Sequence, residues 1–457
     1  MRRSALLLGV LTGALALTPA ACSSSGIGQA SRTPPASASS AAAPTSSSGT
    51  SSTAGSPSAN RSTTATTATT ASPTSAGTSG PSPTASTPRS STAAPTPSAD
   101  PAPSTSPVPA AVQLAYRRMT PAQRAGQLFM VGTPATTASA AVLGVIRRQH
   151  VGSVILTGRS HASVSATHAV SRRLQAAATA AATGGVPLVV AADQEGGNVQ
   201  VLQGPGFSRM PSALTQGGWG TAQLKASART WGRQLAAAGV NLNLAPVMDT
   251  VPSAAAARTN APIGFYRREF GYTPATVASH GTAFLTGMAS ARVATSVKHF
   301  PGLGRVRGNT DTTAGVTDTV TSPTDPYLRP FAAGVRAGAP FLMPSSAYYS
   351  RIDPRHPAAF SPTVLQGLVR RQLGFTGVVI SDDLGSAKQV ARWTPGQRAT
   401  MFIDAGGDMV LTVDPSIVPA MVQAVTARMA SSPAFARKVD AAALRVLTVK
   451  HRMGLLR

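Results

Sequence analysis

The sequence is poor in acidic residues and in cysteine. Its 457 residues include 15 Asp and Glu against 40 Lys and Arg, which gives a formal net charge of +25, and a single cysteine, Cys22. One cysteine excludes an internal disulfide and a cysteine-based metal site. The positive charge could indicate a nucleic-acid ligand, but the arginines are spread along the chain without a helix-turn-helix, zinc-finger or aromatic stacking pattern. We therefore expect no nucleic-acid partner.

Charge and large apolar side chains are almost absent from residues 23–110. The charged residues and sizeable aliphatics of this stretch are only Arg32, Arg61, Arg89, Asp100, Ile27 and Val108. Such a chain cannot bury enough apolar surface to offset its conformational entropy. The composition predicts a disordered Ser/Thr/Ala/Pro-rich linker over 23–110 and a folded part over 111–457, which suits one large domain.

Residues 1–22 are organised like a secretion signal. Two arginines at positions 2 and 3 precede an apolar run at 5–17, which is too short for a lasting membrane span, and small residues precede Cys22. The cysteine and the serines after it resemble the lipidation site of bacterial lipoproteins, with Pro19 in place of the usual leucine. This predicts an extracytoplasmic protein, lipid-anchored to the cell membrane through Cys22 with the linker as a tether, or secreted if Cys22 is not lipidated.

Eight short apolar runs recur in the folded part, separated by alanine-rich stretches long enough for one helix each. The runs are 128–131, 153–157, 187–191, 240–245, 294–297, 340–343, 377–381 and 408–412. Strands without polar alternation are buried on both faces, so eight such units predict an α/β fold, a (β/α)8 TIM barrel. A doubly wound open sheet is the alternative, but no GxGxxG turn follows an early strand.

The scarce acidic residues gather where these predicted strands end. Of the 14 acidic residues between 111 and 457, six follow a strand: Asp193, Glu195, Asp249, Asp382, Asp383 and Asp414. Barrel enzymes carry their chemistry at the carboxyl ends of the strands. The pattern therefore predicts a site there for polyhydroxyl groups, a metal or a developing positive charge.

Several motifs that mark other kinds of catalytic site are absent from the sequence. There is no second histidine near His299 and no HExxH spacing for a metal, no GxSxG nucleophile elbow, and no phosphate-binding P-loop. Carboxylate chemistry on a neutral polar substrate remains, and its commonest form is glycoside hydrolysis. We expect no cofactor and no metal.

Four motifs, in order, resemble the barrel domain of glycoside hydrolase family three in its β-N-acetylglucosaminidase branch, in an actinobacterial-type lipoprotein form. They are DQEGG at 193–197, NLNLAPVMD at 241–249, KHFPGLG at 298–304 and VVISDDLG at 378–385, and the likeness extends from 119 to 414. The resemblance implies a retaining β-N-acetylhexosaminidase that releases terminal β-linked N-acetylglucosamine from cell-wall-derived glycans or muropeptides. We expect it to act as a monomer.

The resemblance also implies roles for single residues. Asp382 matches the nucleophile that forms a covalent glycosyl-enzyme, while Asp383 beside it is expected to be a structural hydrogen-bond acceptor. The residues that match the family's sugar-binding positions are Asp193, Arg268, Lys298 and His299.

The sequence departs from the family at the proton shuttle. The family's loop carries Asp-Ser-His with the histidine as acid/base, whereas here Asn309 stands at the aspartate and Asp311 at the histidine. We expect Asp311 to serve as acid/base, although with a pKa of about 4 it would be ionised at neutral pH unless burial or another carboxylate raises it. Val201 and Ser346 likewise replace a usual arginine and histidine, so the preferred sugar or leaving group could differ.

Two other functions stay open. One is a sugar-binding envelope lipoprotein that is catalytically weak because it lost the shuttle, although such a protein would not need the nucleophile Asp382. The other is a glycoside phosphorylase or transferase of the same family, in which phosphate or another sugar replaces water.

Overall fold

The computed structural model describes residues 108–456. The predicted signal, its Cys22 and nearly all of the 23–110 linker lie outside the described residues and stay predictions. The first described helix is α1 (Ala110–Arg118), which begins one residue before the predicted start of the folded part. Within the described residues, no helix has both the length and the apolar character needed to cross a membrane.

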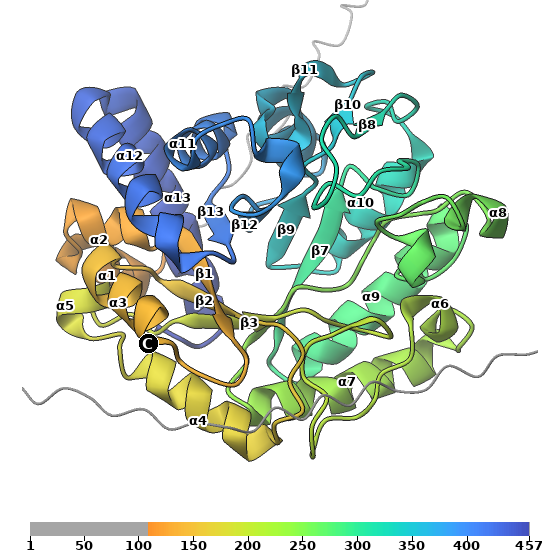
Figure 1. Ribbon diagram of the computed structural model, residues 1–457, viewed down its shortest axis with the longest axis horizontal. Helices are drawn as coiled ribbons and strands as arrows, with labels where there is room; N and C mark the ends of the chain where they lie inside the picture. The colour runs from red at the N-terminus through yellow and green to blue at the C-terminus, as the bar shows by residue number, and fades with distance from the viewer. Residues whose placement is uncertain (1–107, 457) are drawn as a thin grey trace, which may run out of the picture. The chain divides into compact units, whose positions relative to one another are not determined.

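The centre of the described part is a closed barrel of parallel strands, in the spatial order β1-β2-β3-β6-β7-β9-β12-β13 (Figure 1). The strands are β1 (Phe129–Pro134), β2 (Ser153–Thr157), β3 (Val189–Ala192), β6 (Leu242–Asn243), β7 (Ala294–Phe300), β9 (Phe341–Pro344), β12 (Val378–Asp383) and β13 (Met409–Thr412). Each overlaps one of the eight predicted runs. The (β/α)8 barrel is confirmed, and the doubly wound open sheet is excluded.

A principal helical segment follows each barrel strand and covers the outside of the barrel (Figure 1). These are α3 (Ala140–Gln149), α4 (Val164–Gln175), α7 (Thr221–Ala237), α9 (Pro274–Ser290), α10 (Arg329–Arg336), η4 (Thr363–Gln372), α11 (Pro395–Ala405) and α12 (Val418–Ser431). Several begin where a Ser or Thr side chain accepts a backbone N–H of the first turn, as Ser139, Ser163 and Thr394 do.

Shorter elements occupy the ends of the chain and the loops between strand and helix. The helical ones are α2 (Pro121–Gly126), α5 (Ala180–Thr183), α6 (Ala213–Gln216), α8 (Ala254–Ala257), η1 (Gly264–Tyr266), η2 (Pro326–Leu328), η3 (Ala358–Phe360), η5 (Lys388–Val390), η6 (Pro415–Ile417) and the long terminal helix α13 (Pro433–Arg452). The others are the hairpin β4 (Gln194–Gly196) and β5 (Val199–Gln200) and a small sheet of β8 (Thr317–Asp318), β10 (Tyr348–Tyr349) and β11 (Asp353–Pro357).

Helix α13 closes the amino end of the barrel. Its Val446 and Val449 pack against the apolar side chains that fill the barrel interior. The buried Lys450 donates hydrogen bonds to Gln127 Oε1 and to the carbonyls of Gly152 and Pro187, all just before barrel strands. The carboxyl end is the open one, and the loops that follow the strands gather there.

Candidate active site

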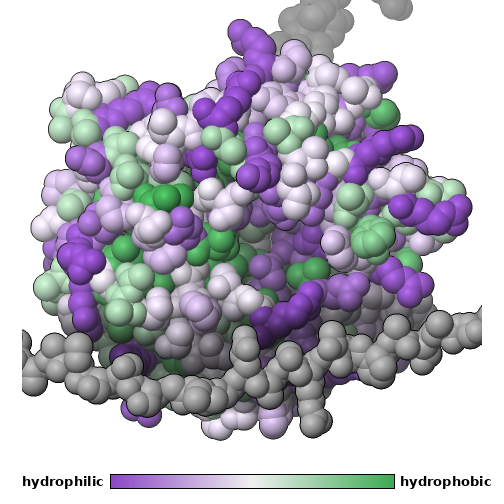
Figure 2. Space-filling model, viewed as in Figure 1, coloured by the Kyte–Doolittle hydropathy of each residue, from purple (hydrophilic) through white to green (hydrophobic). Residues whose placement is uncertain are grey.

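The carboxyl ends of the strands surround a pocket of about 490 Å³. Figure 2 shows that the centre of this face is hollowed and hydrophilic inside. The residues that line the pocket include all six predicted from the sequence to act on a sugar: Asp193, Arg268, Lys298, His299, Asp311 and Asp382. A larger cavity of about 830 Å³ is lined by residues from the segments 312–317, 348–355 and 388–392 and contains none of the six, so we assign the chemistry to the smaller pocket.

Irregular strand ends bring consecutive residues into this pocket. The pairing of β7 with β9 shifts register within the last three residues of β7, and the pairing of β12 with β13 shifts within the last four residues of β12. Such bulges turn neighbouring side chains toward the same side of a strand. As a result Lys298 and His299 both line the pocket, and so do Asp382 and Asp383.

A network of four charged side chains, two of them buried, forms one wall. Lys298 Nζ lies 2.6 Å from Asp193 Oδ1 and 2.7 Å from Glu195 Oε1. Arg268 binds the same Glu195 through two bonds, Nη2 to Oε1 at 2.7 Å and Nε to Oε2 at 2.8 Å. Burial would raise the pKa of Glu195, but the charges of Arg268 and Lys298 outweigh it and lower that pKa to about 2. Glu195 therefore holds both cations in place as a permanent anion.

The network leaves few donors free for a ligand. Arg268 uses three of its five N–H groups, because Nη1 also donates to the carbonyl of Pro262. Lys298 uses two of its three. Asp193 is the most accessible member, with 31% of its side chain exposed. The predicted sugar-binding residues thus act as a linked unit around Glu195, to which the sequence reasoning assigned no role although it lies within DQEGG.

His299 is oriented by a second residue without a predicted role. Its Nδ1 lies 2.8 Å from Oδ2 of Asp249, which is completely buried and also accepts the backbone N–H groups of His299 and Leu303. A carboxylate acceptor favours the tautomer with the proton on Nδ1, which leaves Nε2 for a ligand. The signal for Asp249 in the sequence is its position as the aspartate that ends NLNLAPVMD.

The two aspartates at the end of β12 differ in their contacts. Asp382 accepts one hydrogen bond, from the backbone N–H of Asp383 at 2.9 Å, and forms no ion pair with any residue in 108–456. Asp383 accepts three backbone N–H groups, from Gly385, Ser386 and Val413. Asp383 therefore holds the loop, while the oxygens of Asp382 stay available in the pocket.

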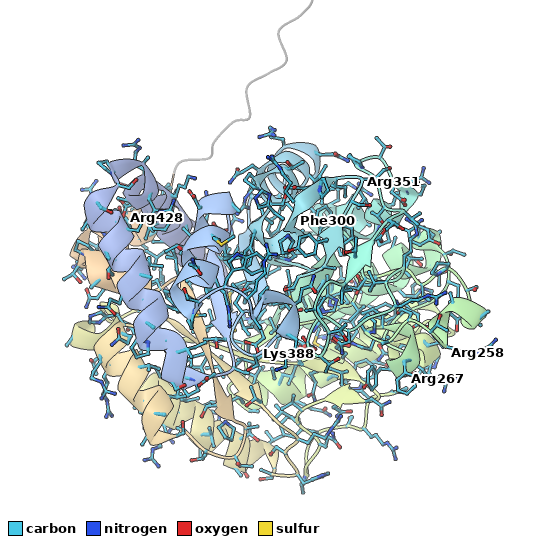
Figure 3. The ribbon with its side chains drawn as sticks, turned by 45° about the horizontal axis from the view of Figure 1, so that its top comes forward. Arg258, Arg267, Phe300, Arg351, Lys388 and Arg428 are labelled. Atoms are coloured by element: carbon cyan, nitrogen blue, oxygen red, sulfur yellow. The ribbon has the colours of Figure 1, made fainter. Side chains whose placement is uncertain are left out.

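Asp311 lies on a loop at the pocket mouth. Its N–H donates to Asn309 Oδ1 at 3.0 Å, and its carbonyl accepts the N–H of Lys388 at 3.1 Å; Lys388 lies near the middle of the face in Figure 3. Although the residue as a whole is exposed, its side chain lines the pocket, and burial there followed by the negative charge of Asp382 raises its pKa to about 6. Arg268 and His299 oppose this rise only in part. A carboxyl with a pKa of about 6 is still mostly ionised at pH 7, but it carries its proton far more often than one with the ordinary pKa of about 4.

The other two positions that depart from the family pattern are Val201 and Ser346, and both lie outside the pocket lining. Val201 is held by backbone hydrogen bonds to Ser160 and Asp193. Ser346 is buried, and its Oγ has no hydrogen-bond partner among the described residues. Neither side chain lines the pocket.

Comparisons with known proteins agree on one family. The profile of the Glycosyl hydrolase family 3 N terminal domain matches residues 121–449. A beta-hexosaminidase of Xanthomonas campestris pv. campestris (strain B100) is 31% identical over 333 residues, which are 69% of this chain and 93% of that protein. The crystal structure of a beta-N-acetylhexosaminidase from Beutenbergia cavernae DSM 12333 is 57% identical, with a TM-score of 0.72 over 73% of this chain and 99% of that one. M tuberculosis LpqI is similar at 27% identity, with a TM-score of 0.64 over 75% of this chain and 98% of LpqI.

Proposed function

Because this chain belongs to glycosyl hydrolase family 3 and spans nearly the full length of β-hexosaminidase relatives, we propose that it is a retaining β-N-acetylhexosaminidase in which Asp382 attacks the sugar. The observation that carries the proposal is the pair of carboxyl groups in one pocket, Asp382 and an Asp311 whose pKa is raised to about 6. Two carboxyl groups with different roles are what retaining hydrolysis requires.

In the first step the carboxylate of Asp382 forms a bond to the anomeric carbon as the glycosidic bond breaks. The departing oxygen takes the proton of Asp311, so the leaving group departs as a neutral alcohol. The product is a glycosyl ester of Asp382 and an ionised Asp311. The raised pKa of Asp311 supports this role because a useful fraction of the acid still carries its proton near neutral pH.

In the second step water attacks the same carbon and Asp311 accepts its proton. Asp382 leaves as a carboxylate, and two inversions give net retention. While Asp382 is esterified it carries no charge, so its repulsion no longer raises the pKa of Asp311. The pKa of Asp311 therefore falls, and the residue is ionised, as a base must be, when water attacks.

The charged wall of the pocket binds the sugar hydroxyls. The partly exposed carboxylate of Asp193 can accept hydrogen bonds from two sugar hydroxyls, and Nε2 of His299 supplies a further contact. Lys298 and Arg268 retain free N–H groups for the sugar oxygens. The ion pairs keep these groups in position before the substrate arrives.

The location and natural substrate are part of the same proposal. The basic and apolar start, Cys22 and the polar linker support a lipid-anchored protein outside the cytoplasm. The natural substrate that we propose for this location is the β-linked N-acetylglucosamine of wall-derived glycans and muropeptides. Radiolabelled palmitate incorporation, lost in Cys22→Ser, tests the anchor.

The activity is tested with the purified protein and aryl β-N-acetylglucosaminides. We expect turnover, with NMR showing the β-anomer of N-acetylglucosamine as the first product, and no dependence on phosphate. Absence of turnover with good and poor leaving groups alike would contradict the proposal. A phosphate-dependent rate with sugar phosphate as the product would point to a phosphorylase.

A further inference from the structure

Two adjacent aromatic side chains are exposed on the turn that borders the catalytic pocket, and the second of them, Tyr266, lines the pocket. Phe265 is 65% exposed and Tyr266 is 39% exposed. Their rings lie edge to face with centroids 5.1 Å apart. The other large hydrophobic side chains exposed to this degree among residues 108–456 are aliphatic: Val108, Leu114 and Val320. Two exposed aromatic rings in contact form an apolar patch, and exposed apolar patches beside a cleft can mark a ligand-binding surface.

The turn that carries the two rings is rigid. The buried Asn260 accepts the N–H of Gly264 on its Oδ1 at 2.7 Å, and its carbonyl accepts the N–H of Phe265 at 3.0 Å. A Cβ at Gly264 would lie only 2.5 Å from Cα of Ala257, so the turn packs closely on α8. The rings are therefore displayed by a fixed scaffold, which lowers the entropy that binding a ligand would cost.

The turn is also attached to the loop of the proposed acid/base. Nδ2 of Asn260 donates to the carbonyls of Leu303 at 2.8 Å and Val306 at 2.6 Å, and the N–H of Ala261 donates to the carbonyl of Arg307. This loop continues to Asp311. Tyr266 and Asp311 line the same pocket, whereas Arg267, the next residue along, lies toward the edge of the face in Figure 3.

These positions place the rings where a leaving group would lie. An acid that protonates the departing oxygen must face the leaving group, so the leaving group occupies the side of the pocket that carries the Asp311 loop. We propose that Phe265 and Tyr266 form a platform for the sugar ring on the leaving-group side of the scissile bond. The C–H groups on one face of a pyranose pack against the electron-rich face of an aromatic ring. The inference rests on the proposed function and specifies its substrate class, a glycan in which another pyranose is the leaving group.

The platform is tested by removing both rings and comparing two substrates. N,N′-diacetylchitobiose carries a pyranose as leaving group, whereas 2,2,2-trifluoroethyl β-N-acetylglucosaminide carries no ring. In Phe265→Ala/Tyr266→Ala we expect kcat/KM for the disaccharide to fall about tenfold relative to the ringless substrate. Phe265→Trp/Tyr266→Trp should keep the wild-type ratio, and so should Leu114→Ala, a matched loss of an exposed apolar side chain on α1.

The outcomes distinguish a failure of the proposed platform from a failure of the proposed function. If the wild-type protein turns over neither substrate, the proposed function fails. If it turns over both and the ratio is unchanged in the double-alanine variant, the platform fails although the function holds. An unchanged ratio together with a lower mass by light scattering would identify the rings as a contact between two copies of the chain and would also overturn the platform.

Discussion

Nζ of Lys298 lies 2.7 Å from Oε1 of Glu195, and only 3% and 4% of the two side chains are exposed. Glu195 also binds Arg268, so one carboxylate is shared by two cations in the wall of the pocket. Removing it leaves both without their shared anion. We predict that Glu195→Gln lowers the free energy of unfolding by about 3–5 kcal/mol, measured by urea denaturation at pH 7.

A matched control for this variant is Asp404→Asn. Asp404 also binds two cations, Arg428 and Lys438, but it and its partners are 40% or more exposed. Asp404→Asn should therefore lower the free energy of unfolding by less than about 1 kcal/mol. The stabilisation by Glu195 is complete above its unfolded pKa of 4.5 and is lost as the pH falls toward 2, so the difference between wild type and Glu195→Gln should shrink only in acid. If Glu195→Gln and Asp404→Asn lowered the free energy of unfolding equally, the role of burial would be contradicted.

Asp382→Ala removes the proposed nucleophile. We predict that kcat falls by about 10³-fold or more, equivalent to about 4 kcal/mol of barrier, while the midpoint of thermal unfolding changes little because Asp382 accepts only one backbone hydrogen bond. A 5-fluoro-N-acetylglucosaminyl fluoride should add one glycosyl mass to the peptide that contains Asp382. A label on Asp311 instead would reverse the two roles.

The pKa of Asp311 predicts a pH profile. The acid must be protonated to act, and its pKa is about 6, so kcat/KM for an alkyl glycoside should fall about tenfold per pH unit above pH 6. Asp311→Asn should remove this dependence and slow alkyl glycosides by about 10²–10⁴-fold, with a smaller effect on dinitrophenyl glycosides, whose leaving group needs no proton. Asp414→Asn is the control, since this carboxyl binds Ser416 outside the pocket and should leave the profile unchanged.

Glu269 is a buried carboxyl whose two oxygens have no hydrogen-bond partner among the described residues. Burial raises its pKa from 4.5 to about 7. The polar backbone of Glu269 itself and the positive charge of Arg267 both lower this pKa, but by less than burial raises it. Between these values the folded state binds a proton that the unfolded state has lost, so the free energy of unfolding should fall as the pH rises from 4.5 to 7. Glu269→Gln should be more stable than wild type by about 2–3 kcal/mol at pH 8 and equal to it near pH 4.5. A difference independent of pH would show that Glu269 does not titrate in this range.

Much of the architecture was predictable because a strand buried on both faces must be apolar throughout. The run at 153–157 and β2 have the same limits, and the other seven runs overlap their strands. The turn at η1 and the bulges at the ends of β7 and β12 were not predictable. They depend on contacts between distant segments, as when Asn260 binds the carbonyls of Leu303 and Val306.

The sequence by itself determined the barrel and, through its motifs, the family and six residues of the pocket. Each of those depends on residue type and order along the chain. Only the tertiary structure decided how these residues act together: Glu195 binds both Lys298 and Arg268, Asp249 orients His299, and burial together with the charge of Asp382 raises the pKa of Asp311. Charge interactions and burial depend on distance in space, and the loops that set those distances take their shape from the folded barrel.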